Sequence, residues 1–177
     1  MSIRYESLDG AVRRAMVREL ERDQASGTLY LSPRLTEDGA EAWPKILLEA
    51  CEQHDDTWIA ATLRSRGLVR DEEQRRKPTG GFTSARVPHT APDTLAEGEF
   101  NRLYSRGLCV DVVASGRMEV EVYRGKDVKS PRAESEAMIG RRVSAQKLLD
   151  DLRVSQGVEP ALGLPPGPNS GLTIRRA

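Results

Sequence analysis

The chain has 177 residues, of which 38% are hydrophobic and 31% charged, so it is long enough for one domain with an appended segment, with a lean core beneath a highly charged surface. Lysine plus arginine and aspartate plus glutamate both number 27, and the formal net charge is zero. This balance argues against a wholly basic protein dedicated to nucleic acid, while it leaves room for a local basic patch.

The cysteine content and the hydropathy pattern predict the compartment. Cys51 and Cys109 are the only cysteines and lie far apart, which is typical of reduced core thiols rather than of a disulfide framework. The sequence holds no apolar run of about 18 residues that could span a membrane. Residues 1–6 lack the apolar stretch of a secretory signal. We therefore expect a protein that is cytoplasmic, or that lies within an assembled particle, and that has no membrane partner.

Residues 1–77 are expected to form a helical N-terminal region. Apolar residues at helical spacing predict a first helix over 8–25, which Gly27 would end. Residues 28–31 then have the composition of a short strand, which Pro33 would stop.

A helical turn and two further helices are predicted before the middle of the chain. Thr36 is a good N-cap for a helical turn over 37–43, and Pro44 is expected to open a separate helix, because proline fits the first helical position. Asp55 or Asp56 should cap the next helix. Short helices joined this closely indicate a compact helical array.

Residues 78–92 are expected to form a connector loop. They contain Gly80, Gly81 and Pro88, and their apolar residues show no period. Loops of this length inside a domain are uncommon and are often functional or mobile.

Residues 93–156 are expected to form an α+β core. The sequence predicts a long central helix over 93–115, with Asp93 as its cap, and a strand over 118–123 in which apolar and polar residues alternate. Burial of such a helix contributes ~1.5–3 kcal/mol for each large apolar side chain before entropy is subtracted. The residues expected to anchor the core are Phe100, Leu103, Tyr104, Leu108, Val112, Val120 and Val122.

Beyond this core we expect two short helices and then an extended arm rich in proline and glycine over 157–177. Ser144 should cap the second helix, and residues 172–174 could add a final strand. Prolines reduce the entropy lost when a segment docks, so the arm is a candidate protein-binding element, although it could also lie on its own domain or be disordered. Its candidate interaction residues are Leu162, Leu164, Pro165, Pro166, Pro168 and Leu172.

No pattern in the sequence names a reaction. Cys51 and His54 have the spacing of a ligand pair, but His89 and Cys109 would form a second pair that is split by a loop and a helix, which zinc sites rarely show. The sequence contains no nucleophile elbow or phosphate-binding loop, and its paired carboxylates fit caps and solvated faces. We therefore assign no catalytic residue, no metal ligand and no cofactor.

Arginine-rich segments form a second candidate surface. Residues 64–77 hold six cations against three anions, and Arg102 and Arg106 share a helix face with Glu99. Clustered cations can bind a phosphate backbone, but they can equally form solvated faces, internal ion pairs or a protein interface. The candidate nucleic-acid-binding residues are Arg64, Arg66, Arg70, Arg75, Arg76, Lys77, Arg124, Lys126 and Arg132.

The expected fold class is α+β, mostly helical, with a small antiparallel sheet, a long central helix and an extended C-terminal arm. The leading functional hypothesis is a non-enzymatic assembly protein, a subunit of a larger complex such as a phage-like or mobile-element structural component, whose partner is another protein or a second copy. The alternative is a nucleic-acid-binding accessory protein, and a small hydrolase or transferase comes third.

Overall fold

The computed structural model describes residues 2–166 and 170–177. The helices are α1 (Gly10–Ser26), α2 (Glu37–Gln53), α3 (Asp56–Ser65), α4 (Ala91–Ala114), α5 (Ala133–Glu136), α6 (Ala145–Val154) and α7 (Val158–Ala161). The strands are β1 (Glu72–Arg76), β2 (Phe82–Arg86), β3 (Glu119–Arg124), β4 (Arg142–Ser144) and β5 (Leu172–Arg176). This arrangement confirms the predicted fold class: a mostly helical α+β protein with a long helix and a small antiparallel sheet.

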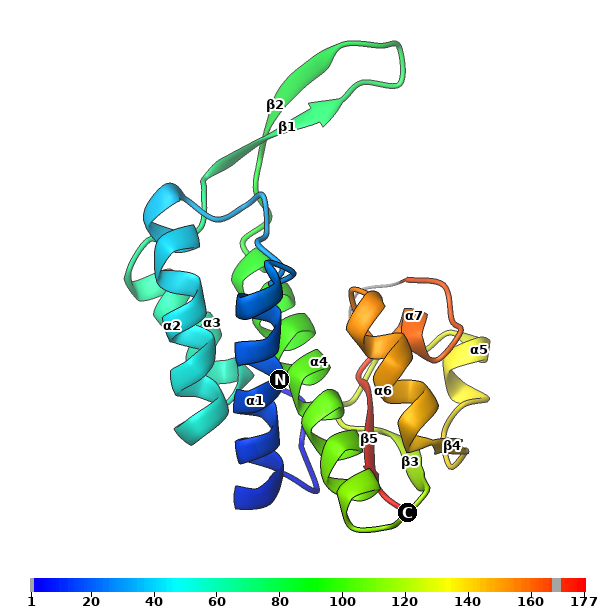
Figure 1. The fold of residues 1–177 in the computed structure, drawn as a ribbon. Coiled ribbons are helices and arrows are strands. Elements are labelled where there is room, and N and C mark those ends of the chain that lie inside the picture. Colours follow the sequence, from blue (N-terminus) through cyan, green and yellow to red (C-terminus); the bar gives the residue numbers. More distant parts are fainter. Residues whose placement is uncertain (1, 167–169) are drawn as a thin grey trace.

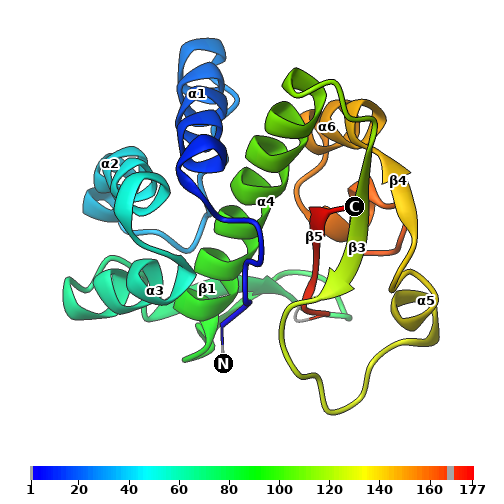
Figure 2. The same ribbon diagram turned by 90° about the horizontal axis from the view of Figure 1, so that it is seen from below.

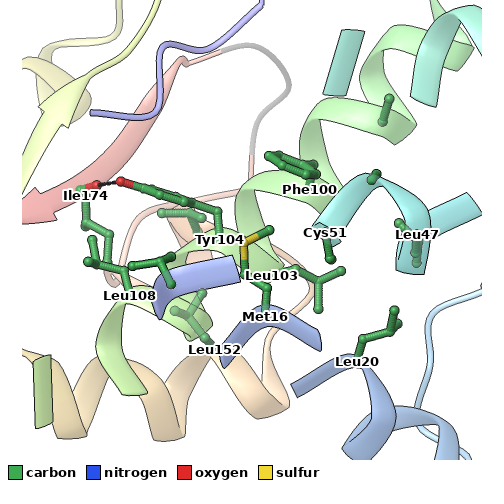
Figure 3. Packing of buried hydrophobic residues seen from close by; sticks show 14 of the residues in the cluster. Met16, Leu20, Leu47, Cys51, Phe100, Leu103, Tyr104, Leu108, Leu152 and Ile174 are labelled. Atoms are coloured by element: carbon green, nitrogen blue, oxygen red, sulfur yellow. Dashed lines mark hydrogen bonds between the residues drawn. The ribbon is translucent and has the colours of Figure 1, made fainter. Parts of the chain in front are cut away.

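Helix α4 lies at the centre of the molecule, between α1–α3 on one side and the three-stranded sheet with α6 on the other (Figure 2). Its apolar residues surround the helix almost completely, and such a helix is stable only when neighbours cover it from several sides. Every side chain predicted to anchor the core is buried. Figure 3 shows Phe100, Leu103, Tyr104 and Leu108 of α4 packed against residues of α1, α2 and α6.

The three-stranded sheet joins the end of the chain to this core. Its order is β4-β3-β5, with antiparallel pairing on both sides of β3, and Val122 lies opposite Ile174. The hydroxyl of Tyr104 donates to the carbonyl oxygen of Ile174 at 2.9 Å (Figure 3). The strand predicted over 172–174 is therefore confirmed, and it is an internal part of the fold.

Three local predictions in the helical region are wrong. Residues 28–31 form no strand, and the indole nitrogen of Trp43 donates to the carbonyl of Tyr30 at 3.1 Å. Pro44 opens no new helix, because α2 runs through it and the buried face that it continues outweighs one missing backbone hydrogen bond. Asp93 lies inside the first turn of α4, whose N-cap is Thr90.

Residues predicted to form an irregular loop instead contain strand β2. It pairs antiparallel with β1 across a turn that includes Gly80 and Gly81, whose φ angles of 89° and 78° lie in the left-handed region that favours glycine. The two strands form a hairpin that projects away from the helices (Figure 1). We refer to residues 71–87 as the hairpin.

Candidate interaction surface

The hairpin is almost entirely exposed to solvent. Of the strand residues, only Glu73 in β1 and Ala85 in β2 are even half-buried. Arg34, from the loop before α2, holds the base of the hairpin through two hydrogen bonds to the Glu73 carboxylate, at 2.6 and 3.1 Å. A lone two-stranded hairpin is marginally stable in water at best. Binding of a partner would therefore stabilise this hairpin.

Both outer edges of the hairpin are open along β1 and β2, although directly before β1 the amide of Arg70 donates to the carbonyl of Arg34. Among the described residues, no backbone hydrogen bond joins β1 or β2 to a segment outside the hairpin. An uncovered edge presents a row of peptide N–H and C=O groups that a further strand can pair with. The geometry therefore offers a ready site for strand addition.

The side chains of β1 divide by charge along the strand, whereas Arg86 of β2 lies at the base opposite Glu72. Acidic Glu72 and Glu73 lie near the base and basic Arg76 and Lys77 lie near the turn, where the side chain of Phe82 is 70% exposed. Hydrogen bonds from Arg34 and then Arg75 hold the pKa of the Glu73 carboxyl below its usual value. Phe82 lies opposite Arg76 in the hairpin register, so an exposed aromatic ring and a cation are both available to a partner.

The predicted basic residues do not converge on one face. Arg64, Arg124, Lys126 and Arg132 each form an ion pair with an acidic side chain. The side chain of Arg70 donates to the carbonyl of Leu35 at 2.8 Å. Arg66 follows α3 and is exposed. Only the remaining three, Arg75, Arg76 and Lys77, are brought together on the hairpin.

The C-terminal candidates lie mainly against the protein's own core. Leu172 is buried in β5, and Leu162 and Leu164 pack half-buried against the hydrophobic cluster. Pro165 and Pro166 are exposed. The remaining candidate, Pro168, lies outside the described residues.

The thiols and imidazoles are dispersed. Cys51 and Cys109 are buried, and desolvation raises the pKa of each thiol to about 12. The ring of His54 stacks on Trp58 with the centroids 4.4 Å apart. Within residues 2–166 and 170–177, no group of three or more histidine, cysteine or acidic side chains is placed to hold a metal ion.

A buried ionic cluster, defined as Glu19, Asp23, Glu99, Arg102 and Arg106, joins α1 to α4. The guanidinium of Arg106 lies 2.7 Å from Glu19 and 2.6 Å from Asp23, and Arg102 pairs with Glu99 at 2.9 Å. The sequence placed Arg102, Arg106 and Glu99 on one face, but not their partners in α1. Those partners are spaced at helical intervals from the buried Met16 and Leu20, which is the signal that could have identified them.

A cleft of about 440 Å³ lies between α4 and the loops around α7. The carboxylates that line it, Glu97, Glu99 and Glu159, are each paired with a basic side chain. The cleft therefore offers no uncompensated charge to a ligand, and the hairpin remains the stronger candidate site.

No family model, curated protein or solved structure matches the chain. None of the helices formed by the described residues is long and apolar enough to cross a membrane. The role of the hairpin is therefore inferred from its own exposure, hydrogen-bonding capacity and charge.

Proposed function

We propose that this protein is a non-enzymatic subunit of a larger assembly and that the hairpin binds the neighbouring protein. The observation that carries this proposal is the open pair of strands that projects from the helical body with almost no buried side chain (Figure 1). A folded chain rarely maintains such a feature for its own stability, because the feature buries little apolar surface.

Binding at the hairpin would satisfy the groups that are exposed in the isolated chain. A partner strand would pair with the free peptide groups, as in other cases of strand addition. Burial of the Phe82 ring would contribute about 1.5–3 kcal/mol. The scattered, acid-paired basic residues outside the hairpin support a protein partner over a phosphate backbone.

The assembly proposal can be tested in an extract of the native source. The full-length chain and a variant in which residues 72–86 are replaced by a short glycine–serine linker are compared by size-exclusion chromatography. We expect the full-length chain in a nuclease-resistant species larger than a monomer, and the variant as a monomer. A full-length monomer, or a large species that survives removal of the hairpin, would contradict the proposal.

Nuclease treatment distinguishes assembly with a protein from the alternative function, nucleic-acid binding. A large species that collapses when nucleic acid is digested, and whose formation depends on Arg75 and Arg76, would replace the assembly proposal with nucleic-acid binding. Phe82→Ser should weaken a protein interface, whereas Met118→Ser, at a side chain that is 79% exposed on β3's side of the molecule, serves as its matched control.

A further inference from the structure

The hydrogen bonds at the two ends of the hairpin determine which peptide groups face outward. The amide of Lys77 donates to Gly81, and the carbonyl of Asp71 accepts from Val87, so both residues face β2. Facing alternates along an antiparallel strand, and Glu73 and Arg75 therefore also face β2. The outward row consists of Glu72, Gln74 and Arg76.

The charges on this strand are antisymmetric about its centre. Residues 71–77 read Asp-Glu-Glu-Gln-Arg-Arg-Lys, with Gln74 in the middle. If a second copy of the strand lies antiparallel with the two Gln74 residues opposite each other, every acidic residue faces a basic one. The pairs, one residue from each copy, are Asp71 with Lys77, Glu72 with Arg76, Glu73 with Arg75, and Gln74 with itself.

We infer that the partner of the hairpin is a second copy of this chain, bound through the free edge of β1 about a twofold axis at Gln74. The inference rests on the proposed function and specifies its partner. The two hairpins then form one four-stranded sheet in the order β2-β1-β1-β2, and a twofold contact of this kind uses the same surface on both subunits.

The backbone pattern agrees with the charge pattern. A twofold axis at Gln74 places the outward backbone N–H and C=O of Gln74 opposite the same groups of Gln74 in the second copy. The outward N–H and C=O of Glu72 then lie opposite those of Arg76 in the second copy. The residues that face outward in one copy therefore meet residues that face outward in the other, and each such pair exchanges both of its backbone hydrogen bonds. A shift of one residue would lose this match.

Other pairings of the hairpin lack this complementarity. Parallel alignment of two β1 strands in register would place glutamate on glutamate and arginine on arginine. A twofold axis at Ser84 on the free edge of β2 would place Arg86 opposite Phe82 and join no charges of opposite sign. The antiparallel β1 contact is thus the one that the sequence of the hairpin favours.

The twofold arrangement places the two helical bodies at opposite ends of the shared sheet. Asp71 lies three residues, or about 10 Å, from Gln74 along the strand, so the turn of each copy lies beside the base of the other hairpin, next to the point where Arg70 donates to the carbonyl of Arg34. Arg76 and Lys77 then lie beside the acidic residues of the second copy, while Phe82 lies on the outer side of Arg76 in β2.

Proline substitutions give the first test. Gln74→Pro removes an outward amide at the centre of the contact without removing a hydrogen bond between β1 and β2, because proline is tolerated where an edge amide faces solvent. Ser84→Pro makes the same change on the other edge and is the matched control. By sedimentation equilibrium of the purified chain, we expect Gln74→Pro to raise the dimer dissociation constant about tenfold or more. Ser84→Pro should leave it unchanged.

Charge reversal gives the second test. One variant carries Asp71→Lys with Glu72→Arg, and the other carries Arg76→Glu with Lys77→Asp. Each variant alone places like charges opposite each other and should dimerise more weakly. An equimolar mixture, or a single chain that carries all four substitutions, restores opposite charges throughout and should regain association.

Each result supports or overturns the inference. A purified wild-type chain that remains monomeric, equal effects of the two proline variants, or a charge-reversed mixture that fails to associate would overturn it. A monomeric purified chain together with a nuclease-resistant complex in the native extract would overturn this inference alone, because the hairpin would then bind a different protein. Retained far-ultraviolet circular dichroism in every variant excludes unfolding as the cause.

Discussion

Arg106 is the most deeply buried charged side chain at the α1–α4 contact, with no exposed surface. It is stable there because Glu19 and Asp23 accept its hydrogen bonds within 2.9 Å. Burial raises the pKa of the Glu19 carboxyl, but hydrogen bonds from Arg153 and Arg106 outweigh this effect and lower it overall. The arginines therefore favour the charged form of Glu19, whereas desolvation raises the pKa of Glu99 in the same cluster.

Removal of the Arg106 guanidinium should destabilise the fold strongly. Arg106→Met keeps the apolar stem but leaves the buried carboxylates of Glu19 and Asp23 with only Arg153 and Arg102 as partners, which is expected to cost up to about 3–5 kcal/mol. Arg64→Met, which breaks the exposed pair with Asp93, should cost less than about 1 kcal/mol. Urea denaturation at pH 7 measures both values, and equal losses would contradict the assignment.

Asp56 is a buried carboxyl that should make stability depend on pH. Desolvation raises its pKa from 3.8 to about 6, although the amide of Ile3 donates to it at 3.4 Å. The Asp56 carboxyl therefore binds its proton more tightly in the folded state than in the unfolded state. Its contribution to the stability of the fold is present below pH 4 and is lost as pH rises through 6.

Asp56→Asn should remove that dependence, because the amide is neutral at every pH and its oxygen can still accept from Ile3. We expect the melting temperature of the variant to rise relative to that of the wild type as pH rises from 4 to 7. Asp38→Asn, at an exposed carboxylate, controls for the loss of one charge. A difference that stays constant or shrinks over this range would rule the effect out.

At the scale of the elements, α1 and α4 approach so closely that only glycine fits at the crossing. A Cβ atom on Gly107 would lie 2.6 Å from Cγ of Met16 and 2.9 Å from the carbonyl oxygen of Val12. Both contacts involve the helix that also supplies two acids of the ionic cluster. The position of Gly107 thus sets the distance between the two helices.

Alanine substitutions on α4 test this packing. Gly107→Ala should destabilise the protein by about 1–3 kcal/mol, because the added methyl group forces the helices apart. Gly98→Ala, where an added Cβ atom would meet no atom within 4 Å beyond the local helix backbone, should be neutral or stabilising by up to about 1 kcal/mol, since alanine favours the helix. Thermal denaturation ranks the two variants, and the reverse order would contradict the packing argument.

The elements with a strong apolar period were predictable from the sequence. The helix expected over 93–115 and the strand over 118–123 correspond to α4 and β3. They were predictable because the spacing of their apolar residues indicates which side chains are buried. Strand β2 was missed, since its residues are exposed and show no apolar alternation. The paired glycines at 80 and 81 were the available signal of a turn between strands.

The candidate site was only partly predictable, because it depends on which residues the fold leaves uncovered. The charged stretch over 64–77 was singled out for its cations, but the sequence could not show that Arg64 pairs with Asp93 while Arg76 projects into solvent. Leu172 was a candidate for binding a partner, yet β5 needs it for the core. Contacts between residues so distant in the chain are fixed by tertiary packing.

At the scale of the whole molecule, the helical body and the hairpin have separable roles. The body buries its apolar side chains around α4, and the hairpin projects from it (Figure 1). Arg34 of the body is hydrogen-bonded to Glu73 at the base of the hairpin. Changes in the hairpin should therefore alter association without altering the melting temperature of the body. This separation allows the contact between copies to be tested in a folded protein.

Disulfide trapping tests the central claim most directly. Residues at the centre of a twofold antiparallel contact have Cα atoms about 5.5 Å apart, within the range of a disulfide. The native thiols, Cys51 and Cys109, are buried and do not compete. Upon mild oxidation, Gln74→Cys should give a covalent dimer on a non-reducing gel, whereas Ser84→Cys, on the opposite edge, should remain monomeric. Equal cross-linking of the two variants, or none in Gln74→Cys, would contradict the account.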